Sequence, residues 1–247
     1  MVAEARFESP DLRCWTGRGV RILVVDSGAV DHPVFAGQPP VTFGLEATAD
    51  GPWSIAPEAA KDMYGHGTAV CGLLHTHAPN AELTSLRVLG TDLRAHSARV
   101  IHAIGWGIDQ GFDLINCSFG SSALQHLPDY KRVVDRAFIA NVWMVAAVNA
   151  VGAMQEYPGC FTSVFGTRAG DLADPLSLRR IPGDIVEFEA AGLGLAVAWK
   201  DGGTRIVSGS SLAAPHLCAQ LARLREVCPQ LNACEARTLM YQWARGT

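Results

Sequence analysis

The sequence predicts an α/β fold, a three-layer sandwich in which a mostly parallel central sheet is flanked by helices on both faces. Short β-branched and apolar runs alternate with amphipathic or alanine-rich segments, which is typical of strands that alternate with helices. The first run, residues 20–25, is almost continuously apolar, as in a parallel strand that is buried on both faces. A chain of 247 residues is long enough to bury a sizeable core as one large domain.

The remaining elements are expected to follow one another along the chain. The expected strands cover residues 20–25, 83–89, 114–118, 142–148, 163–167 and 185–190. One expected helix follows His66. The other expected helices cover residues 97–111, 131–140, 211–225 and 232–244. Residues 36–60, with their glycines, prolines and threonines, are expected to form loops. Residues 1–19 are polar and irregular, so we divide the chain into an N-terminal arm (1–19) and a domain (20–247).

Two of these helices have boundary signals in the sequence. Ser97 is expected to cap the helix over 97–111, and Gly111 is expected to close it. Asn232, with Glu235 three residues later, resembles a capping box at the start of the last helix.

The composition excludes several classes of protein. A hydrophobic content of 49% argues against disorder, and a net charge of −4 without a basic run argues against a nucleic-acid partner. The longest apolar stretch, residues 138–154, is too short and too often interrupted by polar residues to span a membrane. No secretion signal opens the chain, so we expect a cytoplasmic protein with no membrane partner.

The cysteines give no sign of a metal site. There are seven, an odd number with scattered spacing and no CxxC pair, so zinc binding is not expected. Full disulfide pairing is impossible within one chain, and reduced thiols in the cytosol are the simpler interpretation. We expect no metal and no other cofactor.

Three residues are candidates for chemistry. Asp26 follows the first strand at its carboxyl end, where ligand chemistry gathers in parallel sheets, although a turn aspartate is the alternative. His66 lies between two glycines that let other backbone come close, although a structural histidine is the alternative. Ser211 lies where a glycine-containing turn enters an alanine-rich helix. It is a candidate nucleophile at a helix N-terminus, or else an N-cap.

Three sequence blocks together resemble a known family. They are Asp26-Ser27-Gly28, Gly65-His66-Gly67-Thr68 and Gly209-Ser210-Ser211-Leu212-Ala213-Ala214-Pro215-His216, and they occur in that order. They resemble the signature blocks of the subtilisin-like serine proteases, and the resemblance extends from about Gly19 to the last helix. It implies that residues 20–247 form a peptidase catalytic domain.

The resemblance implies a role for each candidate residue. Ser211 would be the nucleophile, His66 its base, and Asp26 the group that orients and stabilises the imidazole. The side-chain amide of Asn149 and the backbone N–H of Ser211 would form the oxyanion hole. The residues implied in substrate binding are Ser118, Phe119, Gly120, Glu156 and Tyr64. The first three would form an edge that pairs with extended peptide. Glu156 would favour lysine or arginine in the substrate, with a solvated loop glutamate as the alternative. Tyr64 would form a wall of the neighbouring pocket, with loop packing as the alternative.

The chain also departs from the family pattern. Ala69 stands where the family usually has a second histidine, outside the triad, so little effect on catalysis is expected. Val148 stands where the family commonly has glycine, which is expected to shift the oxyanion loop. The segment between Leu74 and Ala78 is short, so the calcium site of many secreted members is expected to be absent. No pro-domain precedes the blocks, which is consistent with unassisted folding or with a piece of a larger protein.

The leading hypothesis is an intracellular serine endopeptidase that acts on peptides or proteins in extended conformation through an acyl-enzyme, with one specific protein or precursor peptide as a candidate substrate. One alternative is a peptide ligase or macrocyclase, in which an amine takes the acyl group. Another is an inactive peptide-binding domain, against which the complete set of Asp26, His66, Asn149 and Ser211 argues.

Overall fold

The computed structural model describes residues 11–48, 53–149 and 156–244. Its centre is a nine-stranded sheet in the order β10-β11-β9-β8-β7-β1-β6-β3-β4. Pairs from β11 to β3 are parallel, and only the two outermost strands, β10 and β4, pair antiparallel with their neighbours. The strands are β1 (Arg21–Asp26), β3 (Val41–Glu46), β4 (Ser54–Pro57), β6 (Glu82–Arg87), β7 (Leu114–Cys117), β8 (Trp143–Ala147), β9 (Phe165–Gly170), β10 (Leu178–Arg180) and β11 (Phe188–Ala191).

Two small antiparallel pairs lie beside this sheet. β2 (Gly28–Ala29) pairs with β5 (Lys61–Asp62), and β12 (Leu195–Ala198) forms a hairpin with β13 (Thr204–Val207). The α-helices are α1 (His66–His77), α2 (Ser97–Asp109), α3 (Leu127–Ile139), α4 (Ser210–Val227) and α5 (Ala233–Trp243). Short 3-10 helices cover Leu12–Cys14, Pro33–Phe35 and Leu124–His126.

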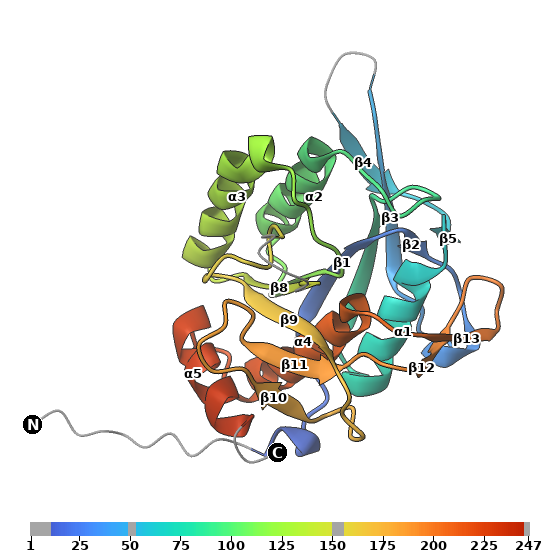
Figure 1. Cartoon of the computed structure of the whole chain (residues 1–247). Helices are drawn as coiled ribbons and strands as arrows, with labels where there is room; N and C mark the ends of the chain where they lie inside the picture. Colours follow the sequence, from blue (N-terminus) through green and yellow to red (C-terminus); the bar gives the residue numbers. More distant parts are fainter. Residues whose placement is uncertain (1–10, 49–52, 150–155, 245–247) are drawn as a thin grey trace, which may run out of the picture.

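The helices cover both faces of the sheet (Figure 1). One hydrophobic core joins α1, α4 and α5 to one face, and a second joins α2 and α3 to the other. Helix α4 is nearly enclosed, with 14 of its 18 residues buried, because its many alanines let α1 and the strands approach closely. The predicted three-layer α/β sandwich is therefore confirmed.

Several local predictions were wrong or shifted. Residues 36–60 were expected to form loops but contain β3 and β4. These strands lie at the exposed edge of the sheet, so no continuous apolar run marks them in the sequence. Ser97 is the first residue of α2, not its cap. The cap position belongs to His96, and the Ser97 hydroxyl instead lies 3.4 Å from Ser121 Oγ. Helix α3 begins at Leu127, four residues before the expected start.

Other local predictions are confirmed. Gly111 follows α2 with a φ of +67°, a left-handed conformation that glycine adopts without steric cost. Asn232 accepts hydrogen bonds from Cys234 N and Glu235 N, and the Glu235 carboxylate accepts from Asn232 N, which completes the capping box.

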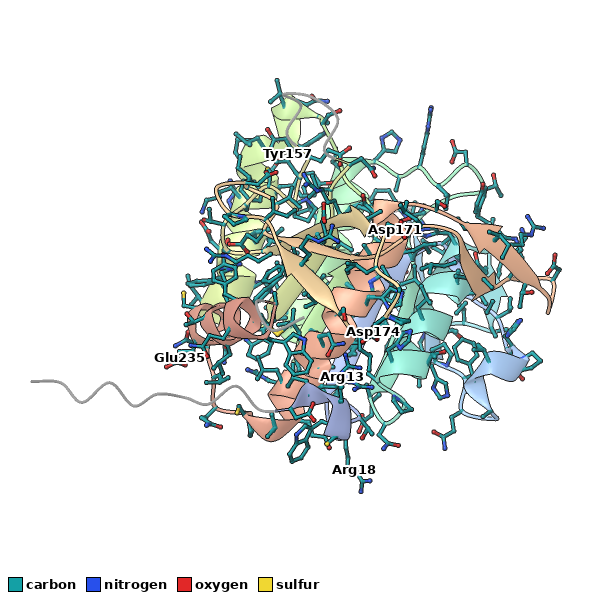
Figure 2. All side chains as sticks on the ribbon, turned by 60° about the horizontal axis from the view of Figure 1, so that its bottom comes forward. Arg13, Arg18, Tyr157, Asp171, Asp174 and Glu235 are labelled. Atoms are coloured by element: carbon teal, nitrogen blue, oxygen red, sulfur yellow. The ribbon has the colours of Figure 1, made fainter. Side chains whose placement is uncertain are left out.

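Residues 11–19 pack against α4 rather than standing apart, whereas residues 1–10 of the expected arm lie outside the described residues. Leu12 is buried in the core, and its carbonyl accepts a hydrogen bond of 3.1 Å from Arg223 Nη1. The Glu226 carboxylate accepts from the backbone N–H of Thr16 and Gly17. Arg13 pairs with Asp174, beside which it lies in Figure 2. In the described part of the chain, no helix combines the length and apolarity that crossing a membrane requires.

Candidate active site

One edge of the sheet gathers the polar residues singled out in the sequence. Strands β1, β7 and β8 are parallel neighbours, so their carboxyl ends lie side by side. Asp26 is the last residue of β1, Ser118 follows β7, and Asn149 lies two residues after β8. Helices α1 and α4 begin at the same edge, with His66 as the first residue of α1 and Ser211 as the second of α4.

The structure joins Asp26 and His66 directly. His66 Nδ1 lies 2.8 Å from Asp26 Oδ1 and 3.0 Å from Oδ2, and the carboxylate is completely buried. The same Oδ1 accepts a hydrogen bond of 2.7 Å from Ser27 N. Burial lowers the pKa of His66, but the charge and hydrogen bond of Asp26, with the charge of Asp62, outweigh burial and raise the pKa above its ordinary value.

A second buried carboxylate, Asp62, organises the loop that carries His66. Asp62 Oδ1 accepts hydrogen bonds from Ser27 Oγ and from the backbone N–H of Tyr64 and Gly65, at 2.7–3.0 Å. Its Oδ2 accepts from both the backbone N–H and the hydroxyl of Thr68, at 2.8 and 2.6 Å. Five donors on one carboxylate fix the first turn of α1 against the end of β1.

Ser211 and His66 line the same cleft, which has a volume of about 560 Å³. No hydrogen bond joins the two among the described residues. In substrate-free sites such bonds are often long and tighten only when substrate binds. The cleft is lined by Tyr64, His66, Leu89, Leu93, Ser118, Phe119, Gly120, Asn149, Trp199, Arg205, Ile206, Val207 and Ser211. It therefore contains every residue predicted for catalysis or binding except Asp26, which lies behind His66, and Glu156.

Glu156 lies behind the cleft rather than in its lining. Its Oε2 accepts a hydrogen bond of 2.6 Å from Asn149 N, and a Cβ placed on Gly120 would lie 2.9 Å from the Glu156 Cβ. The carboxylate thus touches two of the residues that line the cleft. The intervening residues 150–155 lie outside the described residues.

The side chain of Val148 fits because Gly159, which lies against it, has no side chain. Its side chain is buried, and a Cβ placed on Gly159 would lie only 2.4 Å from Val148 Cγ2. The backbone N–H of Val148 donates to Thr167 O at 2.9 Å, so β8 and β9 remain paired next to Asn149.

The described residues hold no group of three or more histidine, cysteine, aspartate or glutamate side chains arranged to bind a metal ion. All seven cysteines are unpaired, and none lines the cleft. Their burial differs widely. For example, Cys71 is buried in α1, where burial raises the pKa of its thiol well above the ordinary value.

The sequence analysis did not identify several residues of this site, among them Asp62, Trp199 and Arg205. Asp62 carried a weak signal, since an aspartate shortly before a helix often binds its free N–H groups. Trp199 and Arg205 had none, because their place in the cleft depends on the β12–β13 hairpin, which was not predicted.

The chain resembles known proteins along nearly its whole length. The subtilase family matches residues 17–246. The minor extracellular protease Epr of Bacillus subtilis is 26% identical over 222 residues, which cover 85% of this chain but only 33% of Epr. The intracellular serine protease of Paenibacillus polymyxa is 27% identical over 227 residues, covering 85% of this chain and 68% of that protein.

A solved structure shares the fold. Sphericase superimposes with a TM-score of 0.75 at 24% identity, covering 90% of this chain and 82% of that one. The family match, the sequence relatives and the common fold lead to one conclusion. The chain belongs to the subtilase family of serine endopeptidases.

Proposed function

We propose that the protein hydrolyses peptide bonds through an acyl-enzyme on Ser211, with His66 as general base and Asp26 as its partner. The observation that carries this proposal is the buried Asp26 carboxylate bound to His66 Nδ1, in a site where His66 and Ser211 line one cleft. Bonding at Nδ1 leaves Nε2 as the nitrogen that takes the proton of Ser211.

The proposed reaction has two steps, acylation of Ser211 and hydrolysis of the acyl-enzyme. Ser211 Oγ attacks the carbonyl carbon while its proton passes to His66 Nε2. The carbon–nitrogen bond then breaks as that proton moves to the leaving amine. Water then attacks the carbonyl carbon of the acyl-enzyme with the same proton transfers through His66, and the carboxylic acid is released. Asp26 stabilises the transient imidazolium, an effect in line with the raised pKa of His66.

Negative charge on the reacting oxygen is proposed to be stabilised by two donors. Ser211 lies in the first turn of α4, where free backbone N–H groups and the helix dipole favour an anion. Asn149 lines the same cleft as Ser211, and its backbone N–H donates a hydrogen bond to Glu156. The Asn149 amide and the Ser211 N–H are the proposed oxyanion hole.

Substrate is proposed to bind in extended form along Ser118, Phe119 and Gly120, with Tyr64 contributing another wall. Glu156, directly behind Gly120, is proposed to favour lysine or arginine before the scissile bond. Its hydrogen bond to Asn149 N engages Oε2, which leaves Oε1 to meet a cation.

The proposed setting is the cytoplasm, and the proposed catalytic domain covers residues 20–247. The similarity to an intracellular serine protease supports this location. A narrow role, cutting one protein or precursor peptide, is part of the same proposal. Rapid digestion of unrelated unfolded proteins would argue against it.

The test is labelling with a fluorophosphonate, followed by mass spectrometry of the labelled peptide. We expect label on Ser211, lost in Ser211→Ala and retained in Ser208→Ala, since Ser208 is exposed and outside the cleft lining. An unlabelled, folded wild-type protein would contradict the proposal. Product masses from a cleaved peptide then separate hydrolysis from transfer to an amine.

A further inference from the structure

The β12–β13 hairpin forms one wall of the cleft and brings a cation to it. Arg205, Ile206 and Val207 of β13 line the cleft together with Trp199, which directly follows β12. Only two residues separate β13 from α4, so this wall is fixed in position relative to Ser211.

Trp199 holds the cation in place. The Arg205 guanidinium carbon lies 4.6 Å from the centre of the Trp199 ring, within the range of a cation–π contact. The Tyr64 ring meets the same indole edge to face at 5.8 Å. Trp199 itself is only 5% exposed, and a Cβ placed on Gly65 would lie 2.4 Å from its Cε2. The indole is thus wedged against the backbone next to His66.

Arg205 keeps donors for a ligand. One guanidinium nitrogen lies 3.2 Å from Asp201 Oδ2, and both side chains are more than half exposed. A guanidinium has five N–H groups in a planar fork that matches a carboxylate, so this single contact does not saturate it. No acidic side chain occurs among the described residues that line the cleft.

The two walls of the cleft therefore differ in charge. Glu156 stands behind the wall formed by Ser118–Gly120, which is proposed to hold the acyl part of the substrate. Since the Ser118–Gly120 wall is proposed to hold the acyl part, we assign the leaving-group part of the substrate to the hairpin wall that carries Arg205.

We propose that Arg205 is a specificity-determining residue that binds a substrate carboxylate on the leaving-group side of the scissile bond. The preferred substrates are then peptides with aspartate, glutamate or the C-terminal carboxylate just after the cut. This inference rests on the proposed function and adds to it the substrate class.

The test uses quenched fluorescent peptides with lysine before the scissile bond and aspartate, asparagine or lysine at the first or second position after it. Matching peptides that end there as a free acid or an amide separate side-chain from C-terminal carboxylates. Because the proposed ion pair is exposed, kcat/KM for the acidic peptide is expected to exceed that for the matching neutral peptide by up to about fivefold.

Variants assign that preference to Arg205. Arg205→Gln should abolish it, Arg205→Lys should retain part of it, and Asp201→Asn should increase it by freeing the guanidinium. Arg179→Gln is the matched control, because Arg179 is similarly exposed and ion-paired but lies on β10, outside the cleft lining.

Two results would overturn the inference while leaving the proposed function intact. They are an active enzyme that does not distinguish aspartate from asparagine after the cut, and an acid preference that survives in Arg205→Gln. An enzyme that cuts no peptide and takes no fluorophosphonate would instead contradict the proposed function itself.

Discussion

Asp62 Oδ1 and Ser27 Oγ are 2.7 Å apart, and this hydrogen bond joins the loop that carries His66 to the strand that carries Asp26. Ser27 Oγ in turn accepts a hydrogen bond of 3.0 Å from Gly67 N, on the other side of His66. The relative position of the Asp26 carboxylate and the His66 ring is therefore set by a buried network, in addition to their own contact.

Asp62→Asn is expected to lower kcat/KM and to move its acid limb to lower pH. An amide has a single acceptor oxygen, so some of the five donors lose their partner and the His66 loop shifts, which costs about tenfold to a hundredfold in rate. Because the Asp62 charge helps to raise the pKa of His66, its removal lowers that pKa, and neutral His66 persists to lower pH. The measurement is a pH profile of kcat/KM.

Ser27→Ala and Asp135→Asn are the controls for this experiment. Ser27→Ala breaks part of the network but keeps the charge, so the rate should fall without the same displacement of the acid limb. Asp135 is an exposed partner of Lys131 on α3, and its substitution should change neither quantity. An acid limb that stays in place in a folded Asp62→Asn protein would refute the electrostatic part of the prediction.

Asn149→Ala is expected to reduce kcat by about a hundred- to a thousandfold with little change in KM. This is the loss typical of removing one oxyanion donor from a serine peptidase, because the donor acts mainly on the transition state. Steady-state kinetics on one peptide substrate give both constants. Asn80→Ala, at an exposed site where Asn80 Nδ2 donates to Thr16 Oγ1, is the control. An equal rise in KM with unchanged kcat would place Asn149 in ground-state binding instead.

Gly159→Ala is expected to destabilise the protein by about 1–3 kcal/mol, because the new methyl group overlaps Val148 Cγ2. The displaced Val148 should carry Asn149 with it and lower kcat by about tenfold. Val148→Ala combined with Gly159→Ala relieves the overlap and should recover most of both losses. Urea unfolding and kcat are the measurements, and strictly additive effects of the two substitutions would show that they do not interact.

Stability is expected to fall as the pH drops from neutral, in part through His216. His216 is buried in α4, and burial together with the nearby His77 lowers its pKa to about 3. Below the ordinary histidine pKa of about 6.5, the unfolded chain binds a proton that folded His216 does not, at a cost of roughly 1.4 kcal/mol per pH unit. His216→Leu should therefore flatten the dependence of unfolding free energy on pH between neutral pH and pH 4, as measured in urea. The exposed His102→Leu should leave the slope unchanged, and equal slopes for both variants would exclude this role for His216.

The sequence predicts the interior of this fold better than its margins. Strands β1, β7 and β8 are buried on both faces, so continuous apolar runs reveal them. β3 and the β12–β13 hairpin have exposed positions, Val41 and Ile206 among them, and leave no such pattern. In the site, three short blocks indicate Asp26, His66 and Ser211, and the structure places Asp26 against His66.

The residues that were missed act through contacts between distant parts of the chain. Asp62 is important because it meets Ser27, and Arg205 because it lies over Trp199 and enters the cleft from the hairpin. A single sequence contains no local pattern for either contact, so both require the folded backbone.

The buried position of α4 determines when the proposed active site can form during synthesis. The chain is made from its N-terminus, so β1 and α1 are complete long before α4. Helix α1 can cover only part of this face of the sheet, and the part that α4 covers stays open until α4 is made, with Ser211 in its first turn. The proposed nucleophile therefore reaches its proposed base only after β1, α1 and the start of α4 have all been made and packed together.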